Sequence, residues 1–485
     1  MILTVILVAV SVFYLSTFRE GHDWGDDFAM YIKHSMNIVE GVPYNDTGFI
    51  PNPTHIIGPQ TYPPLFPLLL SPIYYIWGLN LTAMKVFLAL LTVSSLAFMF
   101  FAFRDHLPVE YRLALIAMIG FNPLFWIFKD NIVSDLPFSF FTFLSLCTIH
   151  TSIRNNPKWP GTIVSALLIS LTIYMAYGTR SVGLVLIPCL IAYDLIKHKR
   201  PSLLGILAVV FTLTAIYLQN KSVHNDGGYG PQITIGTKHI VSHFWIYVKL
   251  LPCYLENGYS KIIKLGLYFC VSCLALIGYF TRLRKGITCF EIFPFLYIGP
   301  FLLLPILPIE RYLAVVVPIY FCYALIGIRS LTAGRKAEVL AFSAFLIVIF
   351  GSYALKYTTM DFGPFREGVG TAESLEMFEY VKKSTSLDDT FLFRKPRALA
   401  AFTDRNASSW DSAMQDSEQW NYIEQIKATY LILGPEELEP VDYAYLQGFI
   451  SRNAERFEKR FSNKNFSIYK ILQNNQTNNH NLTTQ

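Results

Sequence analysis

The feature that most constrains the fold of this chain is a series of apolar runs that recur along its first 355 residues. Each run is roughly 18 residues long, which is the length that an α-helix needs to cross a bilayer. The 485 residues are 53% hydrophobic and 15% charged, whereas soluble domains carry about 25% charged residues. This composition excludes an ordinary cytosolic enzyme. The sequence predicts a polytopic α-helical membrane protein with about eleven transmembrane helices, at 2–18, 82–103, 112–128, 134–150, 161–178, 181–197, 202–219, 262–280, 287–305, 311–328 and 338–355.

Basic residues predict how the chain crosses the membrane. Lys and Arg gather in alternate loops, which the positive-inside rule places in the cytoplasm. The first run has no basic segment before it and no small-residue cleavage site, so we expect a retained helix and not a signal peptide. We therefore expect a multi-pass protein of the cytoplasmic (inner) membrane, with the N-terminus inside and the C-terminal region outside. The basic clusters are Arg104 with Arg112, Arg154 with Lys158, Lys197 with Lys199 and Arg200, Arg282 with Arg284 and Lys285, and Arg329 with Arg335 and Lys336.

Helix-breaking residues and the spacing of apolar residues divide the chain into further segments. Residues 1–355 form the predicted membrane domain, and residues 19–81 form its first external loop. In that loop, apolar residues from Phe28 to Val39 keep helical spacing before Gly41, which predicts a helix lying on the membrane surface. Residues 356–473 alternate helix and strand patterns, which predicts a small extracytoplasmic α/β domain. Residues 474–485 are rich in Asn, Gln and Thr, and we expect them to be disordered.

The first external loop contains an acidic cluster of Asp23, Asp26 and Asp27. One carboxylate suffices to cap the helix that follows and to meet its positive dipole end. Adjacent carboxylates repel one another, which raises the pKa of one of them towards the range of a general base. The cluster therefore indicates a catalytic function in addition to capping.

Other charged residues also lie at predicted outward helix ends. Asp135 precedes one helix, where capping is the alternative interpretation. Arg180 and Arg311 lie against the positive-inside trend, which favours contact with a carrier phosphate. The alternatives are snorkelling for Arg180 and an ion pair with Glu310 for Arg311. Lys85 is a weaker candidate for the same phosphate, because a lone interfacial Lys usually snorkels.

Metal and disulfide chemistry have weak support in the sequence. His239 and His243 have zinc-ligand spacing, but no Glu follows His239 and no third ligand can be named. Cys270 and Cys273 lie inside an apolar run, where they are more typical of packing than of redox chemistry. We therefore predict no metal and no cofactor, although a divalent metal remains open. The modest net charge of +5 is dispersed over the predicted loops, so we expect no nucleic-acid partner.

The first external loop resembles that of the GT-C glycosyltransferases. The resemblance rests on Asp26-Asp27, on the aromatic Phe28 and Tyr31, and on the run Tyr-Pro-Pro-Leu-Phe-Pro that starts at Tyr62. It is closest to the branch of protein O-mannosyltransferases and the aminoarabinose lipid A transferase. Members of this superfamily are polytopic helical bundles, often with a soluble external domain at the C-terminus. The resemblance implies a GT-C-like bundle with the small α/β domain outside the membrane.

The resemblance also implies an activity and roles for individual residues. GT-C enzymes take a sugar from a polyprenyl-phosphate carrier, usually with inversion, and pass it to a lipid, glycan or protein acceptor. Asp26 occupies the position of their general base, and Asp27 stands where many relatives have Glu. Asp23, Asp135 and Tyr31 are expected to position acceptor or donor. Arg180, Arg311 and Lys85 are expected to meet the donor phosphate.

Two other functions remain open at this level. One is a transporter or flippase of lipid-linked saccharides, which internal repeats and charges at the membrane midplane would favour. We find neither feature in the sequence. The other is an enzyme like the O-antigen ligases, which use a pyrophosphate carrier. Acids in an external loop favour a glycosyltransferase over a transporter.

Overall fold

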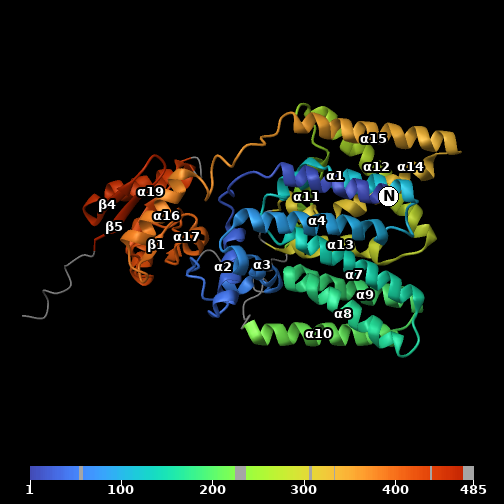
Figure 1. Cartoon of the computed structure of the whole chain (residues 1–485), viewed down its shortest axis with the longest axis horizontal. Coiled ribbons are helices and arrows are strands. Elements are labelled where there is room, and N and C mark those ends of the chain that lie inside the picture. Colours follow the sequence, from blue (N-terminus) through green and yellow to red (C-terminus); the bar gives the residue numbers. More distant parts are fainter. Residues whose placement is uncertain (54–57, 224–235, 305–307, 333, 437–439, 473–485) are drawn as a thin grey trace, which may run out of the picture. The chain divides into compact units, whose positions relative to one another are not determined.

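The chain folds as two compact units, each built from segments that are distant in sequence (Figure 1). The computed structural model describes residues 1–53, 58–223, 236–304, 308–332, 334–436 and 440–472. Met1–Arg19 and Pro63–Gly363 form the helical unit. Glu20–Tyr62 and Pro364–Gln485 form the mixed unit. The predicted boundary at residue 355 differs from this division, because most of the first external loop packs with the C-terminal region.

The helical unit consists of long apolar helices that run side by side (Figure 1). Among the described residues, 7 helices are long and apolar enough to cross a membrane. They are α4 (Leu81–Ala102), α7 (Asp135–Asn155), α8 (Gly161–Thr179), the continuous stretch Ser181–His198 that contains η2 (Ser181–Val185) and α9 (Leu186–His198), α10 (Leu203–Val223), α12 (Lys261–Lys285) and α15 (Arg335–Tyr357). The prediction of a multi-pass helical membrane protein is thereby confirmed, and the count of eleven spans stays a prediction.

Shorter elements complete the helical unit. The shorter apolar helices are α1 (Ile2–Ser16), α3 (Leu65–Trp77), α13 (Cys289–Leu303) and α14 (Val317–Leu331). The connecting elements are α5 (Val109–Gly120), α6 (Pro123–Phe128), α11 (Thr237–Leu250), η4 (Leu251–Leu255) and η5 (Glu310–Leu313). The predicted run 112–128 is therefore not one helix. Asn122 separates α5 from α6 and caps α6 by accepting a hydrogen bond from Leu124 N, with Pro123 at the first helical position.

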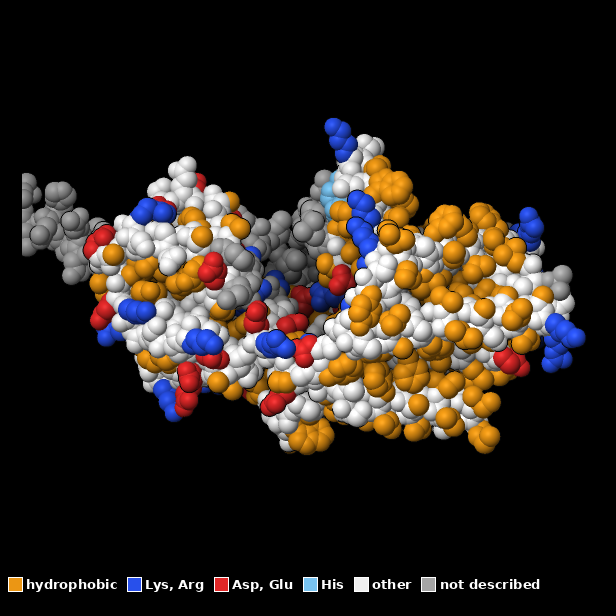
Figure 2. Space-filling view, turned by 90° about the horizontal axis from the view of Figure 1, so that it is seen from above, with side chains coloured by type: hydrophobic (Ala, Val, Ile, Leu, Met, Phe, Trp, Pro, Cys, Tyr) orange, Lys and Arg blue, Asp and Glu red, His pale blue; other side chains and the backbone are white. Residues whose placement is uncertain are grey.

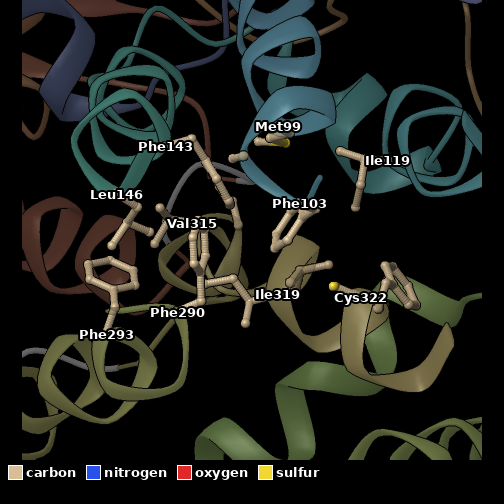
Figure 3. Packing of buried hydrophobic residues seen from close by; sticks show 14 of the residues in the cluster. Met99, Phe103, Ile119, Phe143, Leu146, Phe290, Phe293, Val315, Ile319 and Cys322 are labelled. Atoms are coloured by element: carbon tan, nitrogen blue, oxygen red, sulfur yellow. The ribbon is translucent and has the colours of Figure 1, made fainter. Parts of the chain in front are cut away.

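Hydrophobic side chains occupy both the interior and the surface of the helical unit. Phe103, Phe143, Phe290 and Ile319 converge in the buried core, where side chains from separate helices interlock (Figure 3). Hydrophobic side chains also cover much of the visible outer surface of these helices (Figure 2). Such an apolar exterior fits contact with lipid and not with water.

Two glycines let α12 and α14 approach closely. A Cβ atom on Gly278 would lie 1.9 Å from the backbone oxygen of Tyr323, and one on Gly327 would lie 2.0 Å from that of Leu274. Both distances are far below van der Waals contact. Small residues at a helix crossing allow this backbone approach in membrane proteins.

The mixed unit contains a five-stranded sheet with helices beside it. The strand order is β2-β1-β3-β5-β4. β1 pairs parallel with β2 and β3, and β5 pairs antiparallel with β3 and β4. The elements are α2 (Asp26–Glu40), η1 (Pro59–Thr61), α16 (Ala372–Ser384), β1 (Thr390–Leu392), α17 (Pro396–Thr403), β2 (Asn406–Ser408), α18 (Asp416–Gln425), β3 (Tyr430–Leu433), α19 (Pro440–Arg452), η7 (Ala454–Arg456), β4 (Phe457–Ser462) and β5 (Ser467–Ile471).

Helix α2 joins the first external loop to the rest of the mixed unit. The helix ends at Glu40, and Gly41 follows with a φ of +70°. Its apolar face, including Phe28 and Ile32, is buried, and the helix packs against α17. Protein side chains therefore cover this apolar face, and the prediction that the helix lies on the membrane surface stays a prediction. The apolar period predicted the helix, but its partner α17 is nearly 370 residues away in sequence. Lys33 of α2 bonds to Asp404, which directly follows α17 and lies 371 residues further along the chain.

A buried histidine lies on the inner side of α2. His34 Nδ1 is 2.7 Å from Tyr44 O, and His34 Nε2 is 3.1 Å from Pro59 O. The imidazole also stacks on the Tyr44 ring at 4.0 Å. Burial lowers the pKa of His34 from 6.5 to about 4, although the two carbonyl contacts act in the opposite direction. His34 is therefore neutral at physiological pH.

Candidate functional site

In the helical unit, Asp135 brings together the two arginines that the sequence singled out. Asp135 is the first residue of α7, Arg180 follows the last residue of α8, and Arg311 lies in η5. Arg180 Nη1 lies 2.6 Å from Asp135 Oδ1, and Arg311 Nε lies 3.8 Å from Asp135 Oδ2. We call Asp135, Arg180, Arg311 and Tyr312 the arginine cluster. Three residues predicted separately thus form one group.

Tyr312 holds the two guanidinium groups beside one another. Its ring centroid is 5.2 Å from Arg180 Cζ and 5.6 Å from Arg311 Cζ, within the range of cation–π contact. The backbone around the cluster is fixed by buried tyrosines: Tyr297 Oη donates to Tyr312 O, and Tyr254 Oη donates to Glu310 O, each at 2.9 Å. The cluster is therefore preorganised before any ligand arrives.

The arginine cluster is partly accessible. The side chains of Arg180 and Arg311 are 17% and 22% exposed, whereas that of Asp135 is 6% exposed. Each guanidinium carries five N–H donors, so one arginine can contact a carboxylate and a phosphate at the same time. This arrangement suits an anion with several oxygen atoms.

Lys85 belongs to a different polar group in the helical unit. Lys85 Nζ donates to Arg19 O at 2.9 Å and lies 3.8 Å from Asp130 Oδ1. Lys129 lies 2.5 Å from Asp130 Oδ2 and donates to Thr17 O at 2.7 Å. Lys85, Lys129 and Asp130 are almost fully buried. These contacts favour a structural role for Lys85 at the end of α1, and its role in phosphate binding stays a prediction.

The mixed unit holds the acidic residues of the first external loop. Asp26 begins α2, and its side chain lies outside the described part of the structure. Asp27 Oδ1 accepts a hydrogen bond from Tyr62 Oη at 2.9 Å. Arg397 Nη1 donates to Tyr62 Oη at 2.9 Å and lies 3.7 Å from Asp27 Oδ1. Asp27 is thus fixed by a tyrosine and an arginine.

Asp23 and Tyr31 shape the surroundings of these acids. Asp23 Oδ1 accepts a hydrogen bond from Gly25 N at 3.0 Å, which folds the turn that leads into α2. Tyr31 is buried, and its ring packs edge-on against Tyr62 at 5.1 Å. Both therefore contribute to the framework around Asp27, and their predicted roles in positioning donor or acceptor remain predictions.

Sequence reasoning missed Arg397 and the contacts that Tyr62 and Tyr312 make with the predicted site residues. Tyr62 begins the Tyr-Pro-Pro run, and Tyr312 directly follows Arg311. Both positions could therefore have been predicted as parts of the site. Arg397 follows Tyr62 by 335 residues, and no local pattern connects the two. Long-range packing alone brings Arg397 to the acidic segment.

The described residues give no candidate metal centre. Within those ranges, no group of three or more His, Cys, Asp or Glu side chains is placed to hold a metal ion. His239 Nε2 is 3.0 Å from Leu304 O, and His243 Nδ1 is 3.3 Å from Phe301 O. These contacts to backbone carbonyls give both histidines a structural role in fixing α11.

Comparison with known proteins identifies the class of fold. No family model matches the sequence, and no curated protein matches it. Solved structures, however, share the fold of this chain over nearly its whole length, which confirms the predicted resemblance at the level of the fold.

Three solved structures illustrate the likeness. The oligosaccharyltransferase of Archaeoglobus fulgidus, in complex with Zn and sulfate, has a TM-score of 0.63 at 12% identity over 98% of this chain and 73% of its own. The same organism's AglB, in complex with an inhibitory peptide and a dolichol-phosphate, has a TM-score of 0.57 at 11% identity over 94% and 72%. ArnT from Cupriavidus metallidurans, bound to undecaprenyl phosphate, has a TM-score of 0.60 at 10% identity over 96% and 97%.

Proposed function

We propose that this protein transfers a sugar from a polyprenyl-phosphate-linked donor to a lipid, glycan or protein acceptor at the outer face of the cytoplasmic membrane. The observation that carries the proposal is the arginine cluster, in which Arg180 and Arg311 share Asp135 and stack near Tyr312. Paired guanidinium groups suit phosphate through charge and through several N–H donors. The fold of membrane proteins whose structures hold undecaprenyl phosphate or a dolichol-phosphate supports the same ligand class.

The proposed reaction is a single displacement at the anomeric carbon. The acceptor oxygen bonds to that carbon as the bond from carbon to phosphate oxygen breaks. The acceptor proton passes to a carboxylate, for which we propose Asp26, with Asp27 in support. The leaving polyprenyl phosphate takes the negative charge that develops, and Arg180 and Arg311 stabilise it.

The phosphate role can be tested with undecaprenyl phosphate, the part of the donor that does not depend on the sugar. Arg180→Ala and Arg311→Ala should each weaken its binding to the purified protein about 10- to 100-fold, because a hydrogen bond to a charged group contributes about 1.5–3 kcal/mol. Lys261→Ala is the matched control, since Lys261 is an exposed cation at the start of α12. Binding in detergent can be followed by tryptophan fluorescence.

The outcomes separate the candidate functions. Unchanged affinity in both arginine variants would assign these residues to structure. Weakened affinity together with sugar transfer from a lipid-linked donor supports the enzyme. A protein that binds the lipid-linked saccharide and moves it between leaflets without transferring the sugar would be a flippase.

A further inference from the structure

A basic cavity of about 500 Å³ lies at the end of α7 that is opposite to Asp135. The 21 residues of α7 span roughly 30 Å at 1.5 Å per residue, so this cavity is separate from the arginine cluster. The ends of α7, α9 and α12, the turn after α4 and the segment before α13 all contribute to its lining. The distribution of basic loops predicts that this end faces the cytoplasm. Cavities of this size are typical of small-ligand sites.

Polar groups at the base of the cavity bond to one another. His150 Nε2 lies 3.0 Å from Asp105 Oδ2, and Tyr193 Oη lies 3.1 Å from His150 Nδ1. Arg154 also pairs with Asp105. The hydrogen bond from Arg154 lowers the pKa of Asp105 to about 2, so this carboxylate is charged at any physiological pH. Asp105 and Arg154 therefore neutralise each other.

A second carboxylate, that of Glu291, contacts two of the lining residues and already accepts several hydrogen bonds. Glu291 accepts from Thr288 N at 2.7 Å, from Thr288 Oγ1 at 2.6 Å and from Tyr323 Oη at 2.9 Å. Arg282 Nε is 3.5 Å from Glu291 Oε1, which is an ion pair at the limit of hydrogen-bond distance. Arg282 Nε is buried and has no hydrogen-bond acceptor among the described residues. The Arg282 guanidinium also lines the cavity.

Two lysines complete the lining and form no ion pair among the described residues. Lys197 and Lys285 are exposed, and no ion pair to either is found in the described ranges. Asp105 and Glu291 neutralise at most the charges of Arg154 and Arg282. The two lysines therefore leave an excess of positive charge along the lining of one open cavity, and the positive-inside tendency alone does not require that both line the same cavity.

We propose that this basic cavity binds a phosphate group, carried either by a membrane lipid or by a soluble phosphate compound. Arg282 and Lys285 of α12 and Lys197 of α9 would contact the phosphate oxygens from two helices, and Thr288 also lines the cavity. Charge-assisted hydrogen bonds from several sides are the usual way in which proteins hold phosphate. Ile287, which also lines the cavity and is exposed, is suited to the acyl chain of a lipid source. The proposal is independent of the proposed sugar transfer.

The test measures binding to the purified full-length protein in detergent. The probes are a phosphatidic acid, the diacylglycerol with the same acyl chains, and inorganic phosphate. A double variant, Lys197→Ala with Lys285→Ala, should weaken binding of the phosphate-bearing probe about tenfold or more, because each lysine contributes a charge-assisted contact. The matched control, Arg335→Ala with Lys336→Ala, removes two exposed cations of α15 that lie outside the cavity lining.

Native mass spectrometry and thermal midpoints give the readouts. Binding of phosphatidic acid in preference to diacylglycerol, with loss in the cavity variant alone, supports a lipid phosphate. Stabilisation by inorganic phosphate, lost in the same variant and without preference between the lipids, supports a soluble phosphate. Equal binding in wild type and both variants, or no binding of either phosphate probe, overturns the proposal.

Discussion

Replacing Asp135 by Asn removes the carboxylate of the arginine cluster and keeps its shape. Asp135 is buried and lies 2.6 Å from Arg180 and 3.8 Å from Arg311. Removing one partner of a buried ion pair costs about 3–5 kcal/mol. Because the two guanidinium groups are 17% and 22% exposed, solvent screens part of this loss. We therefore expect Asp135→Asn to lower the free energy of unfolding by roughly 2–3 kcal/mol.

A bound phosphate should offset part of that loss. A ligand that binds only the folded protein stabilises it by about 2.7 kcal/mol at a concentration 100 times its Kd. Undecaprenyl phosphate places a negative charge beside Arg180 and Arg311, and the variant no longer has Asp135 competing for them. The rise in thermal midpoint on adding this lipid should therefore be larger for Asp135→Asn than for wild type. Intrinsic fluorescence during heating in detergent measures both midpoints.

A carboxylate elsewhere in the helical unit provides the control. Asp194 is buried, accepts hydrogen bonds from Ser202 N and Ser202 Oγ at 2.8 and 2.6 Å, and pairs with His198 at 2.9 Å. Asp194→Asn should lower the midpoint, but undecaprenyl phosphate should raise it no more than in wild type. An equal lipid-dependent rise in wild type, Asp135→Asn and Asp194→Asn would refute phosphate binding at the arginine cluster.

Three further predictions concern the acidic segment, the helix crossing and pH. Asp26→Asn should leave the thermal midpoint unchanged but slow sugar transfer about 10²–10⁴-fold, the usual contribution of a positioned general base, and Asp27→Asn should slow it less; normal turnover of Asp26→Asn would exclude this base. Gly278→Ala should destabilise the protein by about 1–3 kcal/mol, because the new methyl group overlaps a backbone oxygen of α14. Gly266→Ala, on the same helix with no atom within 4 Å of the new Cβ, should not destabilise it, and equal midpoints for the two variants would contradict the crossing geometry. Because the pKa of His34 falls from 6.5 to about 4 on folding, the unfolded chain binds the proton more readily, and stability should be lost as the pH falls from about 6.5 to 4. The loss reaches about 3 kcal/mol, and His34→Gln should flatten this part of the midpoint-against-pH curve; an unchanged slope would show that His34 is not the group responsible.

Local patterns in the sequence predicted several elements closely. The apolar period from Phe28 and the glycine at position 41 define α2, which ends at Glu40. Asp135 was expected to precede a helix, and it is the first residue of α7. Both features are decided within a few residues of chain, because capping, backbone φ and amphipathic spacing are local properties.

The features that sequence reasoning missed depend on distant packing. The run 112–128 is mostly apolar, but it divides into two helices at Asn122, whose side-chain amide donates to Tyr254 O and Tyr353 Oη. Those partners come from segments more than 130 residues away. The burial of α2 against α17 and the approach of Arg397 to Asp27 have the same origin. A single sequence carries no period or spacing that records such contacts.

The contrast between two ion groups of the helical unit supports the proposal that the arginine cluster, and not the group around Asp130, binds the phosphate. Around Asp130, the ammonium groups of Lys85 and Lys129 donate to backbone carbonyls, and all three side chains are at most 1% exposed. Around Asp135, the two guanidinium groups are 17% and 22% exposed, and Asp135 Oδ2 accepts no hydrogen bond within the described ranges. A sealed group whose donors reach main-chain oxygens stabilises the fold. Partly exposed guanidinium groups can exchange their contacts for those of an incoming phosphate. Solvent accessibility, and not the number of charges, therefore distinguishes a ligand site from a structural ion group.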